Sequence, residues 1–466
     1  MTSDHTSNVP YHHLYYTKQQ RRRPYQRQLI RCITKYVPKR YLKRRNLKYY
    51  YGIIVLLLFN SLRSMATIDI YPPEDRVETT PDANLKRILF YNKFWKQADF
   101  FVGFGQAPFL NCPETRCMTS GDHEAGPYDA IVIHGVDFVL DGGASDYIDQ
   151  WREPHQRFVF FRLESPGYQW NSYDAPIYND FFNWTMTYRH DSDVVHSYGW
   201  FEDKNKRIVY DFSNVHPDTD DYISNVLPTK DAAFHALATR PNAIAWISSH
   251  CTTLSRREVL VRQLQQYFDV STFGSCGTTP CDIAEKVAGG DNCSYYVKDT
   301  FKFYLALENA FATDYATEKF IRRMVQLETI PIVLGQANYT RIAPPHSYIN
   351  VLEYETLDEL VAYIQKVNTN HSLYLSYFWW RDYYQVRASR EECAAQAFCE
   401  LCGKLWADPI PKSYPNFLAW WKQDANVGGV MPRYEQLVGN TTLGETKASP
   451  FRPPATKLRM NFQGKM

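Results

Sequence analysis

Apolar runs that alternate with helical segments constrain the fold of this chain more than any other feature. Three short runs in the second half have the unbroken hydrophobicity of buried strands, at residues 243–247, 301–307 and 330–334. Three further segments have the apolar spacing of amphipathic helices, at residues 255–268, 315–327 and 357–367. Strands that alternate with helices pair in parallel, so the sequence predicts a doubly wound α/β sheet in this half.

The first half follows the same pattern less regularly. Buried strands are expected at residues 87–91, 130–134 and 158–163, and a polar, irregular segment at 209–230 marks the boundary between the halves. Ligands of doubly wound sheets bind beyond the carboxyl ends of the strands, so the residues that follow each strand are the first candidates for a functional site. The 466-residue chain, 44% hydrophobic, is too long and too apolar to be one small module or a disordered protein.

The N-terminus combines strong positive charge with an apolar stretch. Residues 1–48 carry thirteen Lys and Arg against the single acid Asp4, a balance of +12 that leaves −10 for the rest of a chain whose net charge is +2. Basic runs occur in nucleic-acid-binding proteins, but this one ends against an uncharged stretch with an apolar core at 53–59. This arrangement predicts a membrane signal anchor over 49–68 and no nucleic-acid partner, with the basic tail in the cytosol and the remainder in a lumen. A cleaved signal peptide is disfavoured, because the basic region is far longer than an n-region.

Cysteines and glycosylation sequons support the lumenal location. Nine of the ten cysteines, all except Cys32, follow the predicted anchor. All five N-x-S/T sequons follow it too, and they predict N-glycosylation at Asn183, Asn292, Asn338, Asn370 and Asn440. An odd number of lumenal cysteines leaves at least one thiol free or paired between chains. The spacing permits Cys276 to bond with any of three others, Cys251, Cys281 or Cys293.

Several motifs occur in order along the chain. They are RLESP at 162–166, FNWTMTYR at 182–189, FYLALEN at 303–309, DYATEK at 314–319 and IPIVLG at 330–335. Together they resemble the α1,3/4-fucosyltransferase family, glycosyltransferase family 10, over about residues 86–405. The segment GFGQAPF at 103–109 and the aromatic cluster at 374–384 look most like the invertebrate and plant enzymes that fucosylate the N-glycan core.

The resemblance implies an α/β protein of the GT-B class, in which two Rossmann-like domains face a cleft. Charge and hydropathy predict a cytoplasmic tail (1–48), a transmembrane signal anchor (49–68) and an aperiodic stem (69–85), and the resemblance adds an acceptor-side domain (86–225), a donor-binding domain (226–405) and a C-terminal extension (406–466). The resemblance also implies a single-pass type II Golgi membrane enzyme that transfers L-fucose from GDP-fucose to the 3-hydroxyl of N-acetylglucosamine (GlcNAc) in an N-glycan. The core GlcNAc is the expected acceptor. Two alternatives stay open: a Lewis-type enzyme that acts on antennal GlcNAc, and an inactive glycan- or nucleotide-binding protein.

The same motifs predict a donor site. GDP leaves with negative charge on its pyrophosphate, which cations must meet. Lys319 and Arg257, each expected in the first turn of a helix, fit this role, and Glu318 can accept hydrogen bonds from fucose or ribose hydroxyls. Tyr315 is expected to stack on the guanine. The other donor-binding residues that the resemblance implies are Arg189, Tyr304 and Asn309.

Glu164 is the predicted catalytic base. It follows the strand at 158–163, so its carboxylate should project from the end of the sheet toward the cleft. An inverting transfer needs one carboxylate to take the proton from the acceptor hydroxyl while that hydroxyl attacks from the face opposite GDP. The alternative role for Glu164 is an ion pair with Arg162.

The segment DSD at 191–193 resembles the D-x-D of metal-dependent glycosyltransferases. Because Arg257 and Lys319 already supply positive charge, we expect that no metal or other cofactor is required, and stimulation by a divalent metal stays open.

A C-x-x-C motif at Cys399 and Cys402 would suggest zinc or redox chemistry in the cytosol, but an oxidising lumen favours disulfides. The family ties such a motif to an N-terminal cysteine pair. The resemblance therefore implies bonds between this motif and Cys112 and Cys117, with the partners unassigned.

Overall fold

The computed structural model describes residues 84–136, 138, 152–168, 178–277, 286–287, 290–423 and 431–439. The predicted tail and anchor and almost all of the predicted stem lie outside these residues, as do Cys32, Cys281 and Asn440. Within the described part of the chain, no helix is both long enough and apolar enough to cross a membrane.

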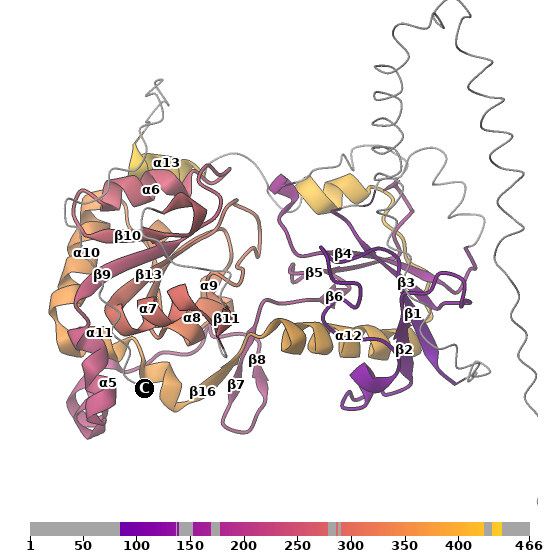
Figure 1. The fold of residues 1–466 in the computed structure, drawn as a ribbon, viewed down its shortest axis with the longest axis horizontal. Coiled ribbons are helices and arrows are strands. Elements are labelled where there is room, and N and C mark those ends of the chain that lie inside the picture. Colours follow the sequence, from indigo (N-terminus) through magenta and orange to yellow (C-terminus); the bar gives the residue numbers. More distant parts are fainter. Residues whose placement is uncertain are drawn as a thin grey trace, which may run out of the picture. The chain divides into compact units, whose positions relative to one another are not determined.

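Six parallel strands form the sheet of the first half, in the order β2-β1-β3-β4-β5-β6 (Figure 1). Their bounds are Lys86–Phe90 (β1), Cys117–Ser120 (β2), Ala130–His134 (β3), Arg157–Arg162 (β4), Trp184–Thr187 (β5) and Val194–Val195 (β6). Every residue of β3, β4 and β5 is buried, which explains the apolar runs at 130–133 in β3 and 158–161 in β4, since a parallel strand is covered on both faces. The three strands predicted in this half are confirmed as β1, β3 and β4.

Five parallel strands form the second sheet, in the order β10-β9-β13-β14-β15. Their bounds are Asn242–Ile247 (β9), Val270–Phe273 (β10), Phe301–Leu307 (β13), Ile330–Leu334 (β14) and Ile349–Asn350 (β15). The three strands predicted here are confirmed as β9, β13 and β14. Strand order reverses between β9 and β13 in this sheet and between β1 and β3 in the first, and such switch points are where doubly wound sheets bind ligands.

Helices accompany the second sheet: α6 (Arg257–Leu264), α7 (Asn292–Thr300), α8 (Ile321–Leu327), α9 (Tyr339–Ile342), α10 (Leu357–Thr369) and α11 (His371–Ser376). The helix predicted at 357–367 is confirmed as α10. The helix predicted at 315–327 is wrong in its first turn, because α8 begins only at Ile321. Asp314 has a positive φ of 61°, and Thr317 donates its backbone N–H to the Glu308 carboxylate at 2.7 Å, so the DYATEK motif forms a loop across the strand ends.

Shorter elements connect these parts. A three-stranded antiparallel sheet has the order β16-β7-β8, with bounds Tyr384–Arg387, Trp200–Asp203 and Ile208–Val209. A second antiparallel pair consists of β11 (Lys286–Val287) and β12 (Gly290–Asp291).

The segment predicted to be irregular at 209–230 is partly helical. The short helices between β8 and β9 are α4 (Thr219–Asp221), η5 (Tyr222–Val226), η6 (Leu227–Thr229), α5 (Ala232–Ala236) and η7 (Leu237–Thr239). The remaining helical turns are η2 (Ala107–Phe109), η3 (Pro166–Tyr168), η8 (Gly274–Cys276), η9 (Val351–Glu353), η10 (Trp379–Asp382) and η11 (Ala419–Gln423).

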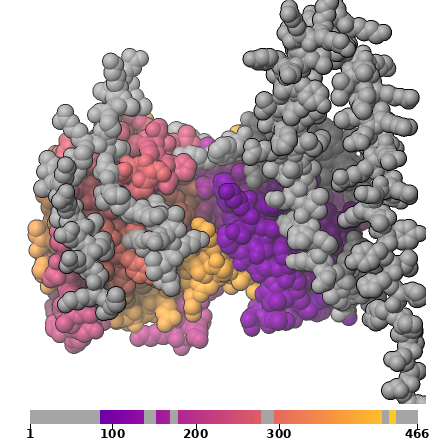
Figure 2. Space-filling model, in the orientation of Figure 1, coloured from indigo at the N-terminus to yellow at the C-terminus, as the bar shows by residue number. Residues whose placement is uncertain are grey.

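Helix α12 (Arg390–Ala407) packs against the first sheet although it follows the second in the chain. Ser389 and Glu392 form a capping box that starts it. The Phe398 ring lies 5.3 Å from that of Phe90, in the same apolar cluster as the β4 and β5 side chains. In Figure 2 orange atoms from the later part of the chain lie against the indigo and violet atoms of the first half. The range 226–405, expected to form the second domain, therefore includes a helix that packs on the first sheet.

The residues after α12 return to both halves. Phe417 and Trp421 pack on Phe160 of β4, at ring distances of 4.8 and 5.0 Å. Helix α13 (Pro432–Val438) then packs on the second half, where Gln263 donates to the backbone carbonyl of Val438 at 2.5 Å. The described residues of the expected C-terminal extension, 406–423 and 431–439, thus contribute to both cores.

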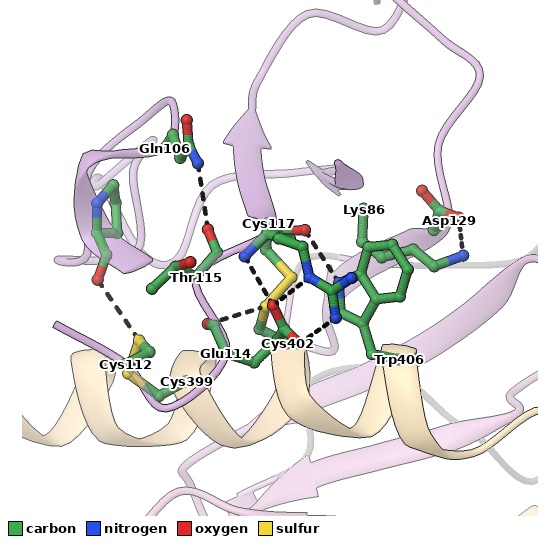
Figure 3. The surroundings of a disulfide bond; sticks show 12 residues. Lys86, Gln106, Cys112, Glu114, Thr115, Cys117, Asp129, Cys399, Cys402 and Trp406 are labelled. Carbon is green, nitrogen blue, oxygen red and sulfur yellow. Dashed lines mark hydrogen bonds and ion pairs between the residues drawn. A yellow bond between two sulfur atoms is a disulfide. The ribbon is translucent and has the colours of Figure 1, made fainter. Parts of the chain in front are cut away.

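Two disulfides fasten α12 to the first half, Cys112–Cys399 and Cys117–Cys402 (Figure 3). The cysteine set that the resemblance implied is confirmed, and the partners are now assigned. Beside the second bond, Trp406 donates its ring N–H to the backbone carbonyl of Arg116 at 3.0 Å.

The other cysteines are divided between bonded and free. A third disulfide, Cys251–Cys276, decides among the alternatives left open for Cys276. Cys293 is disulfide-bonded as well. Among the described cysteines the free thiol is that of Cys393, which is buried.

The two bridges to α12 span 287 and 285 residues of sequence, so either one alone closes nearly the same long loop in the unfolded chain. We expect Cys117→Ala/Cys402→Ala or Cys112→Ala/Cys399→Ala to lower the free energy of unfolding by about 2–3 kcal/mol each. Removing all four cysteines should cost more than the sum, because only then is the long loop released. Chemical denaturation of the three variants measures this, and additive losses would contradict it.

Candidate active site

Glu164 lies at the carboxyl end of the first sheet, two residues beyond β4. Arg162, the last residue of β4, is fully buried and donates its Nε–H to the backbone carbonyl of Glu164 at 3.3 Å. The guanidinium thus contacts the main chain at Glu164, and the Glu164 carboxylate is half-buried beyond it. This arrangement leaves the carboxylate available to a partner from elsewhere.

That partner is Tyr315, on the loop between β13 and α8. Its hydroxyl donates to Glu164 Oε2 at 2.9 Å. The Tyr315 ring is fully buried, 4.9 Å from the ring of Tyr188. Burial, with the nearby charge of Glu164, raises the pKa of Tyr315 well above its ordinary value, so the phenol keeps its proton and remains a donor. The sequence predicts that Tyr315 stacks on guanine, but in this structure the buried Tyr315 ring has no exposed face for stacking.

A cavity of about 580 Å³ opens beside Glu164. Glu318 lines this cavity together with two cations that the sequence did not single out, Arg322 of α8 and Arg390 of α12. Arg322 donates its Nε–H to the backbone carbonyl of Ala388 at 2.8 Å. Burial lowers the pKa of Arg322, Glu318 opposes this and Arg390 adds to it. Arg390 could not be found from the motifs, because α12 reaches the cavity only through its packing on the first sheet.

Lys319 is clamped between two carboxylates at the end of β13. Its ammonium lies 3.2 Å from Glu308 and 3.3 Å from Glu318. Glu308 is fully buried and also accepts hydrogen bonds from Thr317, at 2.7 Å from its backbone N–H and 2.9 Å from its hydroxyl. A side chain at Gly335 would meet the Glu308 Cγ at 3.3 Å and the Tyr339 hydroxyl at 2.6 Å, which explains a glycine directly after β14.

The clamp sets the charge state of its three members. Burial alone would lower the pKa of Lys319, but Glu308 and Glu318 outweigh it and raise this pKa. For Glu318, burial raises the pKa, and the opposing charges of Lys319 and Arg322 with local hydrogen bonds lower it to about 2. Burial raises the pKa of Glu308 against the effect of Lys319. At neutral pH the cation and the outer carboxylate are therefore ionised.

Arg257 lies at the switch point of the second sheet, as the first residue of α6. It is 3% exposed and donates to the backbone carbonyl of Leu307, at the end of β13, and to the Ser248 hydroxyl, just after β9, at 2.9 Å. Among the described residues, Arg257 forms no ion pair with a carboxylate. Asn309 lies nearby, and its backbone carbonyl accepts a hydrogen bond from the backbone N–H of Ser255 at 3.0 Å. Tyr304, in contrast, lies within β13 in the hydrophobic core.

Arg189 does not join the residues around Glu164. It pairs with Asp191 at 2.5 Å and lies over the ring of Trp420, 4.6 Å from its centroid. Asp193 accepts from the Tyr414 hydroxyl at 2.7 Å and from Lys412 at 2.6 Å. Both carboxylates of the D-x-D segment therefore bind protein groups that hold residues 412–421 on the first sheet. Within the described residues, no group of three or more His, Cys, Asp or Glu is placed to hold a metal ion.

The predicted glycosylation sites differ in accessibility. Asn183 accepts hydrogen bonds from Phe158 at 2.8 Å and Arg152 at 2.7 Å, and its amide donates to the Lys412 carbonyl at 2.9 Å, so a glycan on this nitrogen would displace the last contact. Asn338 and Asn370 are exposed. Asn292 is the first residue of α7.

The clamp yields a prediction on stability. Lys319→Met leaves Glu308 buried without its counter-charge and should lower the free energy of unfolding by about 3 kcal/mol at neutral pH. Glu318 has a pKa of about 2 against an ordinary 4.5, so it stabilises the fold above pH 4.5 and this contribution is lost as the pH falls toward 2. The stability gap between wild type and Lys319→Met should therefore narrow as the pH falls below 4.5.

Thermal unfolding across this pH range measures the gap. Lys298→Met is the matched control, because Lys298 makes a more exposed ion pair with Glu328 at 2.9 Å. Its cost should stay below about 1 kcal/mol. Equal losses for the two Lys variants would show that the clamp contributes no more than a surface pair.

Two family models match the chain. The model described as "Fucosyltransferase, N-terminal" matches residues 83–199, and "Glycosyltransferase family 10 (fucosyltransferase) C-term" matches residues 237–421. The chain is 35% identical over 322 residues to alpha-(1,3)-fucosyltransferase C of Drosophila melanogaster, covering 67% of this chain and 70% of that protein. It is 32% identical over 323 residues to alpha-(1,3)-fucosyltransferase fut-6 of Caenorhabditis elegans, covering 66% and 74%.

A solved α1,3-fucosyltransferase structure with GDP aligns with a TM-score of 0.42 at 16% identity, over 72% of this chain and 95% of that one. The family models together span most of the described chain, and both parallel sheets fall within them. The chain therefore belongs to the α1,3-fucosyltransferases of glycosyltransferase family 10.

Proposed function

We propose that this chain transfers L-fucose from GDP-fucose to the 3-hydroxyl of GlcNAc in an N-glycan, with inversion at the anomeric carbon. The observation that carries the proposal is the position of Glu164, a half-buried carboxylate on a cavity of about 580 Å³ with one oxygen held by Tyr315. In this scheme the two parallel sheets are the halves of a GT-B fold, the first presenting the acceptor and the second the donor.

Glu164 acts as the base in this mechanism. Tyr315 occupies its Oε2, which leaves Oε1 to take the proton of the acceptor hydroxyl. The hydroxyl oxygen attacks the anomeric carbon of fucose as the bond to GDP breaks on the opposite face, so no covalent intermediate forms. Because the Tyr315 ring is buried, the carboxylate is oriented before the substrates bind, which is the arrangement that general-base catalysis needs.

Positive charge meets the departing diphosphate. Arg257 offers a buried guanidinium at the switch point of the second sheet, and Lys319 is fixed by its two carboxylates. Arg322 and Arg390 add charge on the cavity wall. The ionised Glu318 is suited to accept hydrogen bonds from fucose or ribose hydroxyls. Four cations supply the stabilisation that a metal provides elsewhere, so the scheme requires no cofactor, and stimulation by a divalent metal stays open.

We also propose that the enzyme is a single-pass type II protein of the Golgi membrane, anchored by residues 49–68 with its catalytic region in the lumen. Three disulfides within the described residues support an oxidising compartment.

Replacing the base tests the mechanism. Glu164→Gln should lower kcat about 10²- to 10⁴-fold, because the amide cannot take the proton. Tyr315→Phe should lower it about tenfold, since it removes only the hydrogen bond that orients the carboxylate. Glu153→Gln, an exposed glutamate before the opposite end of β4, is the control and should retain full activity. GDP should raise the melting temperature of all three variants. Wild-type kcat in Glu164→Gln would assign the base elsewhere.

Product analysis decides the acceptor. The 466-residue chain, expressed in insect cells and solubilised in detergent, is given GDP-fucose with either a core-exposed N-glycan or N-acetyllactosamine. We expect fucose on the core GlcNAc. Transfer to N-acetyllactosamine alone would identify a Lewis-type enzyme. Stabilisation by GDP without transfer to either glycan would favour the inactive binding protein.

A further inference from the structure

The cavity beside Glu164 is lined by two chemically different sets of residues. The charged residues Glu318, Arg322 and Arg390 suit the charged donor, and the aromatic residues of the first half, with Trp95 among them, offer ring faces. An uncharged sugar binds an aromatic ring through its apolar C–H face, while its hydroxyls remain free for hydrogen bonds. We propose that Trp95 is the platform on which a sugar ring of the acceptor glycan stacks, a positioning role that rests on the proposed transferase function.

Trp95 is exposed where its neighbours are not. Its side chain is 49% exposed, whereas Phe94 is 8% and Phe100 1% exposed within the hydrophobic core. The loop is therefore anchored by two phenylalanines that pack inward. The indole is free to contact a ligand in the cavity.

The backbone at Trp95 is one that favours glycine. Phe94 and Gln97 exchange two backbone hydrogen bonds, both at 2.9 Å, which closes a tight turn with Trp95 and Lys96 at its tip. Trp95 has a φ of +56°, and Lys96 is not among the residues with positive φ. Positive φ at the first central residue alone is the pattern of a type II′ turn, where glycine is preferred. A half-exposed indole at this position is not explained by stability, and such departures gather at functional sites.

The location agrees with the topology of the sheet. Trp95 follows β1, and its ring lies 5.8 Å from that of His134, the last residue of β3. Strand order reverses between β1 and β3, so the indole stands at the switch point of the first sheet, where a ligand is expected. His134 is buried and supports the indole from the sheet side.

The test separates binding from stability. Trp95→Gly removes the platform but suits the turn, so it should not lower the melting temperature, while the acceptor KM should rise about 3- to 10-fold with the GDP-fucose KM unchanged. Trp95→Tyr should restore most of the acceptor affinity. Leu110→Ala, an exposed side chain of the same half outside the cavity lining, is the control and should change neither constant.

Isothermal calorimetry with the core-exposed N-glycan gives a second readout that needs no turnover. A raised Kd for Trp95→Gly supports the platform even if the wild-type chain transfers no fucose, in which case only the proposed transferase function fails. Unchanged acceptor KM and Kd in Trp95→Gly would overturn the proposal. A raised KM accompanied by a lower melting temperature and no recovery in Trp95→Tyr would also overturn it, because it would show a structural role.

Discussion

The hydrogen bond from Tyr315 to Glu164 joins the carboxyl ends of the two parallel sheets. Its donor stands on the loop after β13, and its acceptor follows β4. The same loop carries Lys319, which Glu308 holds from the end of β13. One short segment therefore orients both the proposed base, Glu164, and Lys319, the proposed donor-side charge. Because the Tyr315 ring is buried and Thr317 is tied to Glu308, this loop cannot move without breaking contacts in both halves.

Much of this arrangement could be predicted because parallel strands covered on both faces require unbroken apolar runs. β4, β13 and β14 were found in this way, and the place of Glu164 directly after a strand followed from them. The start of α8 was misplaced because the apolar spacing from residue 315 onward is helical, whereas the Glu308 carboxylate captures the Thr317 N–H and holds the chain in a loop. The apolar periodicity of a segment depends only on its own residues, so it cannot reveal the hydrogen bond from Thr317 to Glu308 at the end of β13.

Other features depend on packing between distant segments. α12 has an ordinary helical pattern that does not say which sheet it covers, and the assignment comes from its disulfides and from the contact of Phe398 with Phe90. The role of Arg390 at the cavity follows only from that packing. Trp95 lies in a sequence rich in aromatics, and its exposure could not be told from that of Phe94 before the turn was seen.

The position of α12 has a consequence for synthesis on the ribosome. The first sheet is complete in sequence by Val195, yet the helix that covers part of its core spans Arg390–Ala407. Part of the apolar surface of the nascent first half therefore stays uncovered until more than two hundred further residues have been translated. The two disulfides follow the same order, since Cys112 and Cys117 bond with cysteines that leave the ribosome much later, Cys399 and Cys402. Until α12 has emerged, the uncovered apolar surface of the first half makes the nascent chain prone to aggregation.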